Sequence, residues 1–152
     1  GDAVLKIVGG GERLHQIRCW VIQNRLDQHV MLHGHVTLEE KVDITQKSWL
    51  AITCSVREGW PLAPMEAAAC GTPTVAYDVP GLRDTVKNGK TGILVPDGDV
   101  EDLAEAVLTV VEDDGLRERL SRNSITWASI FTWERTAKET LDVLRGAVHG
   151  NS

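Results

Sequence analysis

The sequence predicts an α/β protein in which a parallel, Rossmann-like sheet is covered by helices on both faces. Short apolar segments alternate with segments whose apolar residues recur at helical spacing. Strand, helix and strand at these lengths imply right-handed crossovers and therefore parallel strands. The 152 residues are the size of one domain, and we expect a single one because no internal repeat or linker divides them.

The elements follow from local patterns. Strands are expected at 4–8, 29–33, 50–54, 74–77 and 92–95. Helices are expected at 12–28, 64–70 and 82–86, and through most of the chain from about 100 onward. Between the second and third strands, Thr37 and Glu40 stand three residues apart, which is the form of a capping box at a helix start.

The composition and the net charge argue against several classes of protein function. The net charge of −6 disfavours a general nucleic-acid binder, which would carry a basic face. The net charge does not exclude a nucleotide ligand, because helix N-termini and backbone amides can bind phosphate. Cys19, Cys54 and Cys70 have neither disulfide nor metal-ligand spacing, which predicts a cytoplasmic setting. No apolar run approaches the ~18 residues of a membrane-spanning helix, so we expect any membrane contact to be peripheral.

Ligands of such sheets bind beyond the carboxyl ends of the strands, and the loop at 55–64 is the most informative one there. Glu58 and Glu66 stand eight positions apart, and each carboxylate could grip vicinal hydroxyls of a sugar or ribose. Gly59 permits close approach of a ligand, and Pro64 suits a helix start, which would put Glu66 in the first turn. Taken alone, each glutamate is equally well explained as a solvated or helix-starting charge.

The run from Glu58 to Pro73 resembles the E-x7-E motif of family 4 (group 1) retaining glycosyltransferases. Segments similar to the same family occur in the right order at 5–11, 30–36, 79–86 and 88–99. The resemblance covers about residues 5 to 144. It implies that residues 1–152 form the C-terminal, donor-binding half of a two-domain GT-B fold.

The resemblance also implies the site. Glu58 would contact the transferred sugar, Glu66 the ribose, and backbone amides at 59–63 the sugar and diphosphate. Gly34 and His35 would lie against the base. The donor-binding residues implied are Glu66, Gly59, Trp60, Leu62, Ala63, Gly34, His35 and Gly11. The donor would be a UDP-, GDP- or ADP-linked sugar, without a cofactor or bound metal. A glycan, lipid or small-molecule acceptor would bind an absent N-terminal domain.

The chain departs from the family pattern in two places. Pro61 replaces the second glycine of E-G-x-G, which removes one backbone donor and stiffens the loop. The family's first strand, with its Arg and Lys partners for the diphosphate, should precede Leu5 and is not present. We therefore expect the strands at 5–8 and 50–54 to pair directly, or a second molecule to fill the gap. The isolated chain should be inactive.

Alternative functions are a nucleotide-sugar 2-epimerase and a non-catalytic interaction or regulatory domain of the same fold. A dinucleotide site is disfavoured, because Leu14 stands where the third glycine of the fingerprint belongs. A metal site at His33 and His35 lacks a third ligand. Trp127 and Trp133 are expected to pack the C-terminal helices against the sheet, and Cys54 and Cys70 are expected to be buried.

Overall fold

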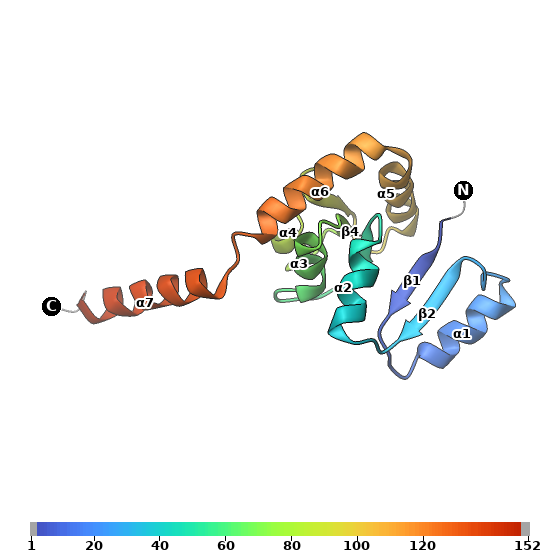
Figure 1. Ribbon diagram of the computed structural model, residues 1–152, viewed down its shortest axis with the longest axis horizontal. Coiled ribbons are helices and arrows are strands. Elements are labelled where there is room, and N and C mark those ends of the chain that lie inside the picture. Colours follow the sequence, from blue (N-terminus) through green and yellow to red (C-terminus); the bar gives the residue numbers. More distant parts are fainter. Residues whose placement is uncertain (1–2, 150–152) are drawn as a thin grey trace. The chain divides into compact units, whose positions relative to one another are not determined.

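The computed structural model describes residues 3–149, in which five strands alternate with helices and two further helices follow (Figure 1). The strands are β1 (Leu5–Val8), β2 (Val30–Gly34), β3 (Ala51–Thr53), β4 (Thr74–Tyr77) and β5 (Gly92–Val95). The helices are α1 (Leu14–Gln23), α2 (Leu38–Gln46), α3 (Leu62–Ala69), α4 (Leu82–Thr85), α5 (Val100–Glu112), α6 (Asp114–Ala128) and α7 (Trp133–His149). Every strand pair is parallel, which confirms the α/β class. The chain divides into two compact units, one ending at Ile44 and the other beginning at Thr45.

The first unit is a two-stranded sheet with α1 packed against β2. β1 pairs with β2 from Leu5 opposite Val30 onward, and the register shifts after Ile7. Gly9 and Gly34 follow at the strand ends with φ of 125° and 67°, values that favour glycine. The amide of Gly9 donates to the carbonyl of Gly34 at 2.8 Å, so the loops leaving the two strands are joined at their first turn.

The capping box predicted at the start of α2 is confirmed. The amide of Thr37 donates to Oε2 of Glu40 at 2.7 Å, and the amide of Glu40 donates to Oγ1 of Thr37 at 3.2 Å. The hydrogen bond from the Thr37 amide holds the pKa of the Glu40 carboxyl below its usual value. The two bonds satisfy amides that a helix start leaves without intrahelical partners.

The second unit is built on β4, the central strand of a sheet with the order β3-β4-β5. All four residues of β4 are buried, and both α3 and α5 pack against this strand. The core gathers apolar residues of β4, α4, β5, α5, α6 and the loop between β4 and α4, which are Val75, Ala76, Tyr77, Val79, Leu82, Val95, Ala106, Val110 and Leu120. Asp99 and Asp113 cap α5 and α6 by accepting from the amides of Asp102 and Leu116.

Close backbone packing joins β4 to its neighbours in the second unit. A Cβ atom on Gly92, the first residue of β5, would lie 1.9 Å from the carbonyl oxygen of Thr74. Only glycine fits this contact, so Gly92 has a structural role in the sheet. α6 is fixed to the segment between α4 and β5 by three side-chain donors, each bound to a backbone carbonyl. The pairs are Trp127 Nε1 to Thr85 at 2.9 Å, Asn123 Nδ2 to Lys90 at 3.0 Å, and Ser124 Oγ to Thr91 at 3.0 Å.

The expected direct pairing of the strands at 5–8 and 50–54 stays a prediction, because these strands belong to different compact units. Within the described residues of each unit, β1 pairs with β2, and β3 pairs with β4. Association with a second molecule through a strand edge stays a prediction.

The C-terminal tryptophans differ from expectation. Trp127 is half-buried, as expected, because its indole N–H has a carbonyl partner. Trp133 is 87% exposed, and the side chains of residues 133–147 are all exposed, so α7 does not bury it. Within the described part of the chain, no helix is both long enough and apolar enough to cross a membrane.

Candidate functional site

The site predicted around α3 begins where β3 ends. Pro61 is buried and precedes the helix with φ −68° and ψ 124°, values that a proline adopts without strain. α3 begins at Leu62, two residues earlier than expected, so Pro64 is its third residue and Glu66 lies in the second turn. A proline is tolerated there because the first amides of a helix lack intrahelical partners. The side chains of Glu58 and Glu66 are both exposed.

In the part of the chain that the structure describes, the amino end of α3 has no side-chain cap. Pro61 offers no side-chain acceptor, and the first turn of α3 contains no acidic residue. The amides of Leu62 and Ala63 therefore stand at the positive end of the helix dipole without a capping side chain. Such an end suits a negatively charged ligand, and Glu58 and Glu66 lie on either side of it along the chain.

The loop that carries Glu58 rests on the loop that follows β4. A Cβ atom on Gly81 would lie 2.4 Å from the carbonyl oxygen of Glu58 and 3.0 Å from that of Gly59. Gly81 has φ 84°, a conformation that other residues rarely adopt. The same loop is closed by Asp78 and Arg83, whose carboxylate and guanidinium lie 2.6 Å apart. Loops from two neighbouring strands are thus locked together by backbone contact.

The first unit carries the other predicted residues. The imidazole of His35 lies against Gly10, where a Cβ atom would come within 2.2 Å of its Nε2 atom. Gly11, with φ 141°, accepts a hydrogen bond from the amide of Leu14 as α1 begins. A groove of about 170 Å³ beside β1 is lined by Ile7, Val8, Gly9, Gly10, Gly11, Arg13, Leu14 and Ile17. Gly11 therefore lines a groove whose rim includes the cationic side chain of Arg13.

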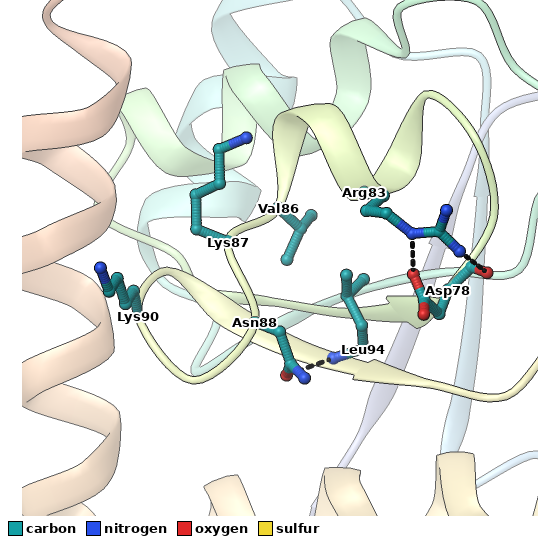
Figure 2. Close-up of a pocket in the computed structure, with 7 residues that line it drawn as sticks. All are labelled: Asp78, Arg83, Val86, Lys87, Asn88, Lys90 and Leu94. Carbon is teal, nitrogen blue, oxygen red and sulfur yellow. Dashed lines mark hydrogen bonds and ion pairs between the residues drawn. The ribbon is translucent and has the colours of Figure 1, made fainter.

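A second depression of about 430 Å³ is lined by Asp78, Arg83, Val86, Lys87, Asn88, Lys90 and Leu94 (Figure 2). None of the residues predicted for the donor site lines it. Figure 2 shows that the ends of the Lys87 and Lys90 side chains do not converge with the Arg83 guanidinium, which is bound to Asp78. This depression therefore lacks a focused cationic centre.

The histidines and cysteines do not form a further centre among the described residues. His33 and His35 have different surroundings, since His35 is exposed, whereas Nε2 of His33 is buried and has no hydrogen-bond partner within residues 3–149. In residues 3–149, no three His, Cys, Asp or Glu side chains gather in a way that could hold a metal ion. Cys54 is exposed and not buried as expected, because it follows β3 at the sheet edge. Partial desolvation raises the pKa of its thiol, so it is not an activated nucleophile.

Residues 1–127 match the family model described as glycosyl transferases group 1. The chain belongs to this family. It is 41% identical over 112 residues to a D-inositol 3-phosphate glycosyltransferase of Nocardioides, covering 74% of this chain and 24% of that protein.

Solved structures agree with this family. A sucrose-phosphate synthase from Thermosynechococcus elongatus is 28% identical with a TM-score of 0.84, over 96% of this chain and 39% of that one. The Anabaena protein HepE in complex with UDP-glucose is 22% identical with a TM-score of 0.82, over 94% of this chain and 41% of that one. The fold is that of GT-B glycosyltransferases, and the chain spans about a quarter to two fifths of these proteins.

Within this glycosyltransferase chain, the predicted residues fall into two groups. Glu58, Gly59, Trp60, Leu62, Ala63 and Glu66 lie together in the second unit, and Gly11, Gly34 and His35 in the first. Sequence reasoning missed Gly10, Gly81 and Arg13 as residues of the site. The glycine run at 9–11 and the segment at 79–86 were noted, but which glycine contacts which loop depends on distant backbone. The relatives' names do not favour an epimerase or an interaction domain.

Proposed function

We propose that this chain is the C-terminal, donor-binding domain of a family 4 glycosyltransferase. The complete enzyme would transfer a glycosyl group from a nucleotide sugar to an acceptor with retention of configuration. One observation carries the proposal: exposed Glu58 and Glu66 stand before and after the uncapped amino end of α3 along the chain, and the loop before the helix contacts the backbone of Gly81. The UDP-glucose bound by HepE supports a nucleotide-sugar donor.

Each group has a role that its chemistry suits. The Glu66 carboxylate accepts from the two ribose hydroxyls, and Glu58 accepts from hydroxyls of the transferred sugar. Negative charge grows on the diphosphate as the sugar leaves, and the amides of Leu62 and Ala63 stabilise it at the helix end. This arrangement needs no resident metal, which matches the family resemblance.

The nucleotide base is assigned to the first unit. Gly34 and His35 would lie against the base, and Gly11 would line the nucleotide side of the groove beside β1. The acceptor, whether a glycan, a lipid or a small molecule, would bind a part of the enzyme outside this chain. The comparison with a relative about four times as long as the segment it shares with this chain supports that division.

The test is nucleotide-sugar binding by the full-length protein, measured by calorimetry with UDP-, GDP- and ADP-glucose. Selective binding of one donor is expected. Glu66→Gln should weaken it roughly tenfold or more, since a charge-assisted hydrogen bond is worth about 1.5–3 kcal/mol. Glu105→Gln, at an exposed second-turn position of α5, is the matched control and should change nothing. Failure of all three donors to bind, or equal effects of the two variants, would contradict the proposal.

A further inference from the structure

The loop from Val56 to Trp60 has little packing of its own. All five of its residues are exposed. The backbone of Glu58 and Gly59 rests on Gly81. A second contact is needed to fix the lateral position of the loop, because an exposed loop with one backbone contact can still rotate about it. Trp60 supplies that contact.

Trp60 is the first of three aromatic rings in contact. Its ring centroid lies 5.3 Å from that of Phe131, with the planes tilted by 53°. The ring of Phe131 in turn meets Trp127 edge-to-face, at 4.9 Å and 78°. These separations are in the range where aromatic pairs attract beyond simple burial. Phe131 is the middle ring and comes from the short segment between α6 and α7.

The last ring of the series is firmly held. Nε1 of Trp127 donates to the carbonyl of Thr85 at 2.9 Å, and Thr85 is buried. The ammonium of Lys87 lies 4.6 Å from the ring centroid of Trp127, at cation–π distance. The amide of Phe131 donates to Ala128 at 3.1 Å, which fixes the backbone just beyond α6. The position of Phe131 is therefore set by α6 and α4.

We propose that Phe131 is a positioning residue for the sugar-binding loop. It touches neither sugar nor nucleotide; it holds Trp60, and through Trp60 the adjoining Gly59 and Glu58. This inference rests on the proposed function, in which Glu58 contacts the transferred sugar. The ribose contact at Glu66 belongs to α3, so Phe131 should affect the sugar end of the donor and spare the nucleotide end.

The experiment compares Phe131→Ala with Phe131→Tyr in the full-length protein, and Ile130→Ala is the neighbouring control. Phe131 is 44% exposed, so its truncation leaves no buried cavity and the variant should fold. Two readouts are used: hydrogen exchange of amides 56–60 without ligand, and binding and turnover of UDP-glucose against binding of UDP.

We expect Phe131→Ala to speed exchange at 56–60. It should lower kcat/KM for UDP-glucose roughly two- to tenfold while the Kd of UDP stays the same. Phe131→Tyr should restore both readouts, and Ile130→Ala should affect neither. In Trp60→Ala, the further change Phe131→Ala should have little added effect, because its partner is gone.

The outcomes separate this inference from the proposed function. Unchanged exchange at 56–60 in Phe131→Ala would show that Phe131 does not position the loop. Faster exchange with unchanged UDP-glucose turnover, or an equal loss for UDP, would also overturn it. If the wild type binds no nucleotide sugar, the proposed function fails by itself, and the exchange measurement still decides whether Phe131 holds the loop.

Discussion

Glu58 and Glu66 differ in what holds them, although both are exposed. Glu66 belongs to α3, whose backbone is fixed by helical hydrogen bonds. Glu58 belongs to a loop whose backbone depends on contacts with Gly81 and, through Trp60, with Phe131. A substitution at Glu58 can act through a contact to the ligand or through the position of the loop. Comparing the binding of two ligands to one variant separates these two effects.

Glu58→Ala should reduce the affinity gap between a nucleotide sugar and its free nucleoside diphosphate. The lost carboxylate is expected to weaken binding of the sugar nucleotide roughly tenfold or more and binding of the diphosphate little, since only the former carries the hydroxyls of the transferred sugar. Calorimetry with both ligands on the full-length protein measures this gap. Glu112→Ala, at the exposed end of α5, is the control. Equal losses for the two ligands would mean that Glu58 only supports the loop.

At the scale of elements, the contact between the loops after β3 and β4 has a direct test. Gly81→Ala places a methyl group 2.4 Å from the Glu58 carbonyl and also strains a backbone with φ 84°. Gly89→Ala carries a similar φ of 70° but meets nothing within 4 Å. Both variants should lose about 1–3 kcal/mol of stability from backbone strain.

Only Gly81→Ala should also weaken nucleotide-sugar binding, because only it displaces the loop of Glu58. Denaturant unfolding gives the first quantity and calorimetry the second. Equal loss of binding in both variants would show that strain alone, and not the contact between the loops, governs the site.

The capping box of α2 should make that helix sensitive to acid. The pKa of Glu40 is lower in the folded state than its ordinary value of 4.5. The ionised carboxylate therefore stabilises α2 fully at pH values above 4.5. This stabilisation is lost as the pH falls through the lower pKa of the folded state. Glu40→Gln should thus make α2 amides exchange faster than wild type at pH 7 and equally fast in strong acid. Glu39→Gln, one residue earlier in the same turn, keeps the box and should show a smaller change. A difference that persists undiminished in acid would rule out the carboxylate.

For the whole molecule, we predict that purified residues 1–152 transfer no glycosyl group. Transfer requires donor and acceptor in one near-attack arrangement, and relatives of this family are about four times longer than the matched segment. A radiolabelled nucleotide-sugar assay with a panel of acceptors, run beside the full-length enzyme, makes the measurement. Turnover by residues 1–152 would place the acceptor surface within this chain.

The fold class and most elements could be predicted because their signals are local. Thr74–Tyr77 and Gly92–Val95 have the bounds expected, and Thr37 and Glu40 form the capping box their spacing indicates. The contacts that shape the site are long-range. The residues next to Gly81 in the sequence do not indicate that Gly81 contacts the backbone of Glu58. The positions of the tryptophans do not indicate that Trp127 is half-buried while Trp133 is exposed. These depend on how distant backbones approach each other.

The hydrogen bonds that attach α6 to residues 85–91 restrict the choice of side chains on α6 but not on the segment it binds. Three side chains of α6 donate, and the acceptors are main-chain carbonyls, which every amino acid possesses. Over evolutionary time the helix must therefore keep its donors at Asn123, Ser124 and Trp127. The segment it binds can exchange an exposed side chain such as Lys90 without losing a single one of these bonds. Relatives should accordingly differ at exposed positions of the accepting segment, such as Lys90, more readily than at the three donors on the helix.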